Sequence, residues 1–171
     1  MLNKEQLHQA ITSQISAYIG IREDQGDNRS KIIDLINKYM GLALGSPYCL
    51  SAIQYCLGQV EKQNDGVKFY LPFTGHCQTF FNSVNPKFKH STPQAGDVVI
   101  WKYAGTSSGH AGYVEKVLDG GRIQTIEFNT RDSTGVIREG DGCYRCVRSV
   151  KGSKLMPIMG FVRIVDASNA V

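Results

Sequence analysis

The stretch that decides the fold is HAGYVEKVLDGGRIQTIEFNT, residues 110–130. Two runs that contain Val, Ile and Thr flank an Asp-Gly-Gly turn signal, and this pattern predicts a β-hairpin. Similar runs precede and follow the hairpin, GDVVIWKY at 96–103 and MGFVRIV at 159–165. The second half of the chain is therefore expected to form an antiparallel sheet.

The first third of the chain instead repeats its apolar residues at helical spacing, which predicts three helices. The second helix is expected to run from about Asn28 to Gly41, and Ser46 and Pro47 fit the N-cap and first position of the third. A shorter helix is expected around GHCQTFFNSV, residues 75–84. Helices followed by antiparallel strands indicate an α+β fold, with the N-terminal helices packed on the C-terminal sheet. The apolar stripes of the first and third helices are Leu7, Ile11, Ile15 and Ile19, and Leu50, Ile53, Leu57 and Val60.

Length and composition fit one domain. The chain has 171 residues, of which 42% are hydrophobic and 20% charged, and a chain of this length buries a sufficient core without disulfides or metals. We expect a single domain over residues 1–171, with its core at about 20–165 and no separate binding module. The net charge of +4 is spread along the chain, which suits an anionic polymer but is too diffuse to predict nucleic-acid binding.

The N-terminal residues predict neither a signal peptide nor a membrane span. Lys4, Glu5 and His8 interrupt the apolar positions, and no run approaches the ~18 apolar residues that cross a bilayer. We expect synthesis in the cytoplasm and no membrane insertion. The five cysteines are accordingly expected to be reduced thiols.

Cys49 has a position that favours reactivity, although most buried cysteines are packing residues. If the third helix begins at Ser46, Cys49 lies in its first turn, among unpaired N–H groups at the positive end of the helix dipole. Both effects favour the thiolate, which is the nucleophilic form. Cys56 lies two turns later on the same face, away from the unpaired N–H groups and the positive end of the helix. Its thiol therefore serves as a comparison for the reactivity of Cys49.

A nucleophilic cysteine requires a base, usually a histidine that a third polar group orients. Of the four histidines, His110 is favoured because it begins a strand after a loop. In the predicted hairpin His110 faces Asn129 or Thr130, depending on whether the turn is centred before Gly120 or on it. In the first register Asn129 lies directly across from His110, and Glu127 lies diagonally on the same face.

A zinc site is the main alternative use of the cysteines. CYRC, residues 143–146, could supply two ligands, with His76 or Cys77 as a third. Zinc requires four ligands and the chain has one such pair. We therefore expect no metal, and we interpret Cys143 and Cys146 as thiols in a loop between strands.

Four segments together resemble one known family, the cysteine, histidine-dependent amidohydrolase/peptidase (CHAP) family of the papain-like superfamily. They are GSPYCLSAI (45–53), TPQAGDVVIWK (92–102), SGHAGYVEKV (108–117) and IEFNT (126–130). The segment before the cysteine also resembles the lead-in of phage and bacterial members, so the resemblance covers about residues 20–165. It implies a papain-like fold and a single CHAP-like catalytic domain.

The resemblance implies hydrolysis of an amide bond in bacterial peptidoglycan, by an N-acetylmuramoyl-L-alanine amidase or a peptide-stem endopeptidase. By motif, Cys49 is the nucleophile, His110 the base, Glu127 the group that orients His110, and Asn129 a supporting residue. Family members usually have Trp before the cysteine, whereas this chain has Tyr48, whose ring is expected to border the substrate. No cofactor is implied.

The expected role is that of a phage endolysin or a related lytic enzyme, which acts as a monomer on the cell wall after release or assisted export. Two alternatives stay open. The chain could be a secreted amidase toxin of interbacterial competition, or a non-catalytic homologue that binds the cell wall.

Overall fold

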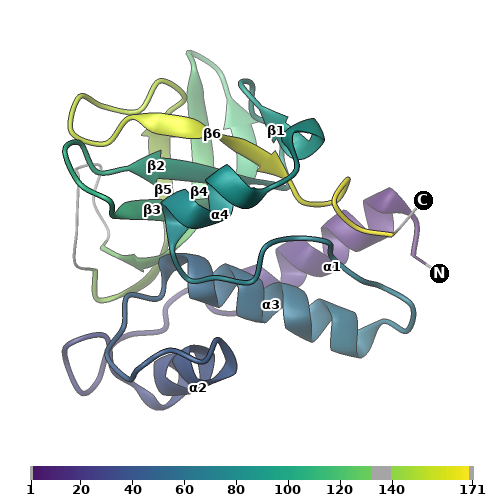
Figure 1. Ribbon diagram of the computed structural model, residues 1–171. Coiled ribbons are helices and arrows are strands. Elements are labelled where there is room, and N and C mark those ends of the chain that lie inside the picture. Colours follow the sequence, from purple (N-terminus) through teal and green to yellow (C-terminus); the bar gives the residue numbers. More distant parts are fainter. Residues whose placement is uncertain (1, 132–139, 170–171) are drawn as a thin grey trace.

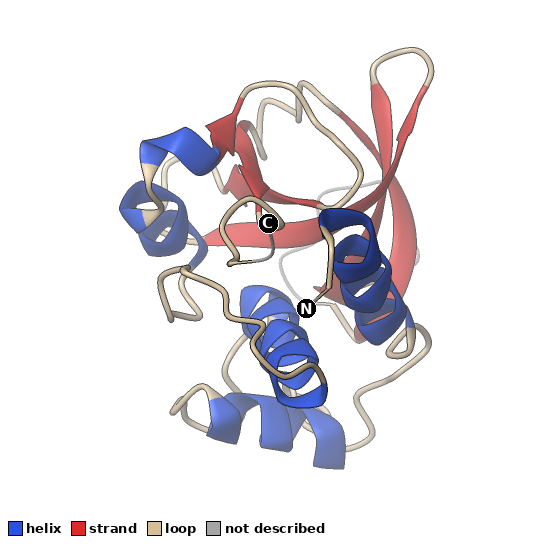
Figure 2. Cartoon of the chain, turned by 90° about the vertical axis from the view of Figure 1, so that its right-hand side faces the viewer, coloured by secondary structure: helices blue, strands red, loops and turns tan. Residues whose placement is uncertain are grey.

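The computed structural model describes residues 2–131 and 140–169. The described chain forms an α+β fold, which confirms the prediction from the sequence. α3 packs against the sheet and lies between the sheet and α2 (Figures 1 and 2). α1 packs mainly on α3 and contacts β3 through Thr12 and Tyr113. The helices are α1 (Lys4–Ser16), α2 (Lys31–Tyr39), α3 (Cys49–Gln63) and α4 (Cys77–Ser83), and the strands are β1 (Lys89–His90), β2 (Asp97–Lys102), β3 (Gly109–Leu118), β4 (Arg122–Thr130), β5 (Gly142–Ser149) and β6 (Ile158–Arg163).

The strands form an antiparallel sheet in the order β1-β6-β2-β3-β4-β5. One face of the sheet packs on the helices, and the predicted stripes on α1 and α3 are buried there, apart from Ile19, which follows the end of α1. A second apolar cluster around Trp101 and Phe161 lies on the opposite face of the sheet. None of the helices within the described ranges is long and apolar enough to cross a membrane.

α2 begins three residues later than the sequence predicts. Its first residue is Lys31, and the side chain of Ser30 caps it by accepting from the N–H of Ile33. Asn28, the predicted start, has a left-handed backbone with φ of 60°, so it belongs to the preceding turn. Gly41 also has a positive φ, of 69°, which agrees with its predicted place just beyond the helix.

α3 begins at Cys49, so the prediction that Ser46 caps it is wrong. Side chains from elsewhere hold the segment before the helix. Asn28 Nδ2 donates to the carbonyl of Gly45 at 3.1 Å, and Asn37 Nδ2 donates to that of Ser46 at 3.0 Å. These contacts hold residues 45 and 46 outside the helix, and Cys49 becomes its first residue.

The β3–β4 hairpin uses both predicted registers. Tyr113 pairs with Ile126 in the first register, whereas Lys116 pairs with Gln124 in the second, and a bulge at Glu115 separates them. The half that leads towards residue 110 follows the first register. The predicted pairing of His110 with Asn129 lies beyond the paired residues of this half, which end at Tyr113 and Ile126.

β5 was missed by the sequence analysis. Cys143 and Cys146 lie in this strand and are buried, so the expectation that they occupy a loop is wrong. The pattern misleads because Arg148 points inward and Val147 outward, with Arg148 7% and Val147 40% exposed. An outward apolar residue beside an inward arginine inverts the alternation that identifies a strand.

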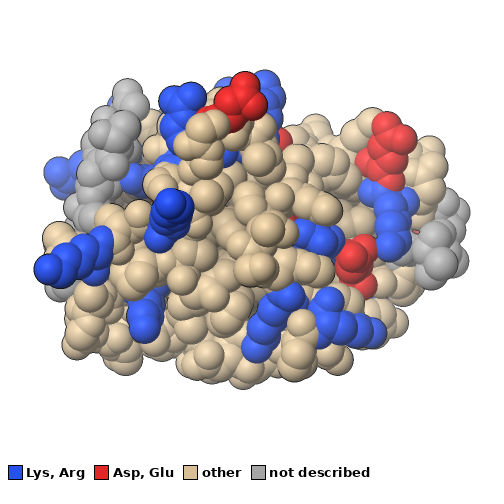
Figure 3. Space-filling model, turned by 90° about the horizontal axis from the view of Figure 1, so that it is seen from above, with Lys and Arg blue, Asp and Glu red and all other residues tan. Residues whose placement is uncertain are grey.

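The positive charge of the chain is not gathered into one patch on the face shown in Figure 3. Lys and Arg side chains are scattered across that face, with Asp and Glu between some of them. This distribution agrees with the diffuse net charge of +4.

Candidate active site

Cys49 lies where α3 starts, at the edge of a pocket. As the first residue of the helix it is among the positions whose N–H groups have no partner within the helix. Its side chain is 5% exposed and lines a pocket of about 160 Å³ together with His110 and Asn129. The later start of the helix therefore leaves Cys49 within the first turn, at the positive end of the helix dipole.

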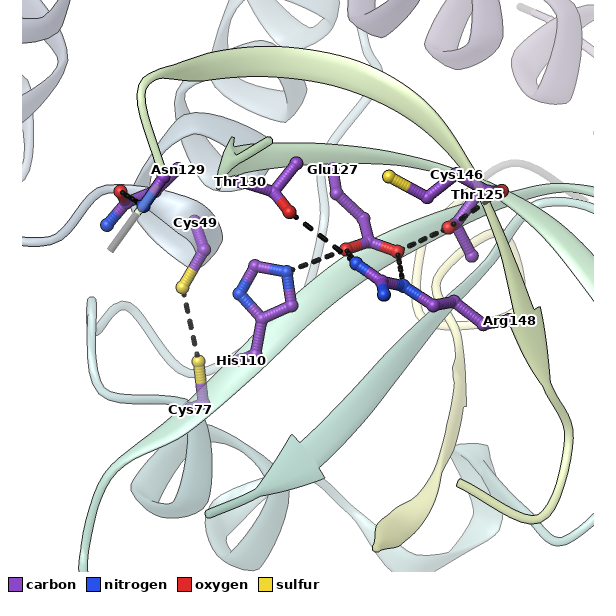
Figure 4. Close-up of polar contacts among 10 residues, drawn as sticks. Cys49, Cys77, His110, Thr125, Glu127, Asn129, Thr130, Cys146 and Arg148 are labelled. Atoms are coloured by element: carbon purple, nitrogen blue, oxygen red, sulfur yellow. Dashed lines mark hydrogen bonds and ion pairs between the residues drawn. The ribbon is translucent and has the colours of Figure 1, made fainter. Parts of the chain in front are cut away.

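His110 comes from the first part of β3 and lies between Cys49 and Glu127 (Figure 4). Its Nε2 is 2.9 Å from Glu127 Oε2, which leaves the other ring nitrogen on the side of Cys49. Trp101, its neighbour on β2, stacks on the ring with centroids 5.7 Å apart and an interplanar angle of 27°. The contact with Glu127 and the stacking together fix the orientation of the imidazole.

The carboxylate of Glu127 is completely buried and has several partners. Arg148 donates to both of its oxygens, through Nε at 2.8 Å and Nη2 at 2.7 Å, and the Thr125 hydroxyl donates at 2.5 Å. Gly112 makes room for this side chain, because a Cβ there would lie 3.0 Å from Glu127 Cγ. The carboxylate is thus held in one orientation towards His110.

These contacts shift the pKa values of the buried groups. Burial by itself would raise the pKa of Glu127, but hydrogen bonds from Arg148 and His110 outweigh it and bring the pKa to about 2. Burial by itself would lower the pKa of His110, but Cys49 and Glu127 raise it to about 9. At neutral pH His110 is therefore an imidazolium next to an ionised Glu127.

Cys77 is the closest sulfur partner that the structure gives Cys49. It is the first residue of α4, and its Sγ is 3.7 Å from Cys49 Sγ. The hydrogen bond from Cys77 lowers the pKa of Cys49 most strongly, burial opposes it, and His110 lowers it further, so the pKa lies well below the usual value. The same contact and burial raise the pKa of the Cys77 thiol. The geometry of the contact allows either sulfur to donate, and His110 beside Cys49 favours Cys49 as the thiolate and Cys77 as the donor.

Asn129 borders the pocket on the side of Cys49 (Figure 4). It has a left-handed backbone with φ of 51°, which asparagine tolerates better than most residues. Its Oδ1 accepts a hydrogen bond from the N–H of Gly140 at 3.2 Å. The side chain therefore ties β4 to the residues before β5, and it is placed to face whatever occupies the pocket.

Tyr48 does not border the pocket. Its side chain is 0% exposed, and its hydroxyl donates to Glu23 Oε1 at 3.4 Å. The ring packs into the core beneath the start of α3, so the expectation that it contacts substrate is wrong. Pro47 and Tyr103 line the pocket instead.

Arg148 is not among the site residues predicted from the sequence, and Cys77 is predicted there only as a possible zinc ligand. Arg148 could be found only by recognising β5, which aligns it opposite Ile123 on β4. Cys77 carried a weak signal as a cysteine near the start of a short predicted helix. Within residues 2–131 and 140–169, no three His, Cys, Asp or Glu side chains lie close enough to hold a metal ion.

We expect iodoacetamide at neutral pH to alkylate Cys49 well before Cys56, as measured by peptide mass spectrometry over time. Both thiols lie on α3, but burial raises the pKa of Cys56, whereas Cys49 has partners that lower its pKa and lines a pocket. His110→Ala should slow the alkylation of Cys49 because it removes the neighbouring positive charge. Equal rates for the two cysteines would contradict the assignment.

We expect Arg148→Met to lower the free energy of unfolding by about 3–5 kcal/mol in urea denaturation, because it leaves the buried carboxylate of Glu127 without its main partner. Arg145→Met on the same strand is the matched control. Arg145 pairs with Glu115, but its side chain is 51% exposed, and an exposed pair contributes at most about 1 kcal/mol. Similar losses for the two variants would refute this account of Arg148.

Comparison with known proteins agrees with this geometry. No curated protein matches the chain. A family model for the CHAP domain matches residues 41–129, more than half of the chain, and the match includes Cys49, His110 and Glu127. The chain belongs to the CHAP domain family.

Proposed function

We propose that this protein is a peptidoglycan hydrolase that cleaves an amide bond with Cys49 as nucleophile, His110 as general acid and base, and Glu127 as the group that holds His110. The observation that carries the proposal is the position of His110, which lines one pocket with Cys49 and contacts the buried Glu127 on its other side (Figure 4). CHAP domains belong to amidohydrolases and peptidases that use a cysteine and a histidine, so the family supports this chemistry.

In the proposed reaction the Cys49 thiolate attacks the carbonyl carbon of the amide. The N–H of Cys49, free at the start of α3, is placed to donate to the oxygen that becomes negative. The His110 imidazolium gives its proton to the leaving amine, and neutral His110 then takes a proton from the water that attacks the thioester. Glu127 stabilises the imidazolium form at the beginning and the end of the cycle.

The surface around Cys49 suits an extended substrate. A second pocket, of about 270 Å³, adjoins the first and shares Pro47, Cys49, Ser108 and Gly109 with it. Cys49 thus lies where the two pockets meet, with room for a chain on either side of the bond. The net charge of +4 favours an anionic polymer such as peptidoglycan.

We propose a lytic role such as that of an endolysin, for a protein made in the cytoplasm that reaches the cell wall after release or assisted export. A toxin delivered into a rival cell would use the same chemistry. The neighbouring genes test the choice, because a holin gene supports lysis and a gene for a small immunity protein supports a toxin.

Digestion of purified peptidoglycan, followed by mass spectrometry, tests the proposed reaction. Free lactyl ends on the glycan would identify an amidase, and shortened peptide stems an endopeptidase. Cys49→Ala should abolish either product, whereas Cys56→Ala, on the same helix, should retain it. If the folded, reduced protein releases no product, the hydrolase proposal is wrong and a binding role is favoured.

We expect kcat/KM to fall above about pH 9, because His110, with a pKa of about 9, then loses the proton that the leaving amine requires. Glu127 raises the pKa of His110. Glu127→Gln should therefore move the descending limb of the pH profile of kcat/KM by about 1–3 units towards lower pH. Glu115→Gln, on the same strand as His110, is the control and should leave the limb in place. A limb that does not move in Glu127→Gln would show that Glu127 does not act on His110.

A further inference from the structure

The contact between Cys49 and Cys77 offers a chemistry beyond amide hydrolysis. Each cysteine is the first residue of its helix, α3 and α4, and the two sulfur atoms lie 3.7 Å apart (Figure 4). A disulfide joins two sulfur atoms at about 2.05 Å, so an approach of under about 2 Å would close the contact. No step of the proposed hydrolysis forms a bond to Cys77.

The surroundings of α4 allow such an approach. α4 has 7 residues, and residues 70–76 before it form neither helix nor strand. α4 packs on β2, β3 and β6, so the approach is expected from the two cysteine side chains and from the irregular segment before α4.

Both cysteines line the same groove. Cys49 and Cys77 line the pocket of about 270 Å³, together with Leu42 and Gly75. A small uncharged oxidant such as a hydroperoxide fits a space of this volume. The oxidant can therefore reach Cys49 at the place where Cys77 lies beside it.

We propose that Cys49 and Cys77 are a reversible redox pair, in which a hydroperoxide converts the two thiols into a disulfide that blocks the nucleophile. The formation of the disulfide is independent of the substrate of the enzyme. The accompanying loss of hydrolysis rests on the proposed function.

The first step consumes one hydroperoxide. The Cys49 thiolate attacks one oxygen of hydrogen peroxide, an S–O bond forms, and the O–O bond breaks. The leaving hydroxide takes the proton of the His110 imidazolium and departs as water, which leaves Cys49 as a sulfenic acid.

In the second step Cys77 resolves the sulfenic acid. Its sulfur attacks Cys49 Sγ, an S–S bond forms, the S–O bond breaks, and the hydroxide leaves as water with the Cys77 proton. Overall, two thiols are oxidised by two electrons and the peroxide is reduced to two waters. A dithiol reductant reverses the change by thiol–disulfide exchange.

The two cysteines act in the order that these steps require. Cys49 is next to His110 and is the thiolate that attacks peroxide, and its contact is the first cause of the raised pKa of Cys77. When Cys49 becomes an uncharged sulfenic acid this cause is lost, so Cys77 gives up its proton more readily as it attacks. Cys56 lies on the same helix as Cys49, but its pKa is raised by burial, so it is a matched control for a buried thiol without this chemistry.

The test treats the reduced full chain with equimolar hydrogen peroxide and then analyses intact mass and non-reduced peptides. We expect the wild-type protein to lose two hydrogen atoms and to yield one linked pair of peptides that contain Cys49 and Cys77. Cys56→Ser should give the same product. Cys77→Ser should give a sulfenic acid at Cys49 that dimedone traps and that excess peroxide converts to sulfinic acid.

The proposal is overturned if the wild-type protein forms sulfinic acid at Cys49 as readily as Cys77→Ser, or if Cys49 links to another cysteine. Circular dichroism of each variant verifies that it is folded. Hydrolysis of peptidoglycan should be lost with the disulfide and return fully after dithiothreitol. Because mass and peptide links are read without peptidoglycan, failure of the redox pair and failure of the hydrolase proposal give different results.

Discussion

The buried carboxylate of Glu127 is the group on which the rest of the site depends. An ion of this kind in a protein interior costs several kcal/mol unless it is paired and hydrogen-bonded. The structure meets this requirement with three neighbouring strands, because His110 comes from β3, Glu127 from β4 and Arg148 from β5. The order of strands at this end of the sheet is therefore tied to the chemistry of the site. A shift of one residue between any two of them would turn one partner to the opposite face.

The bulge in β3 helps to keep two charge networks apart. On one side of it His110 and Glu127 face each other, and the bulged residue, Glu115, pairs with Arg145 near the surface. β5 thus supplies one arginine to the buried carboxylate of Glu127, and a second, half-exposed arginine to Glu115. Only the buried pair has strong consequences for the site, since solvent screens the exposed pair.

The sequence predicted what is local and missed what depends on distant contacts. The hairpin, its register at Tyr113 and Ile126 and the stripe on α3 follow from turn residues and periodicity. The start of α3 does not, because Asn28 and Asn37 hold the preceding segment from outside. Arg148 was missed because a buried arginine beside an exposed valine hides β5. Its position is explained by the charge of Glu127, which lies far from it in sequence.

The charges of the site alternate along one line, from the Cys49 thiolate through the His110 imidazolium and Glu127 to Arg148, so each buried charge has neighbours of opposite sign. Because of this coupling, the pKa of His110 depends on whether Cys49 carries a charge. Cys49 contributes to the raised pKa of His110, and that contribution is lost when the sulfur becomes an uncharged thioester or disulfide. The pKa of His110 then falls. His110 therefore gives up its proton more readily to the leaving amine and is neutral when it must activate water.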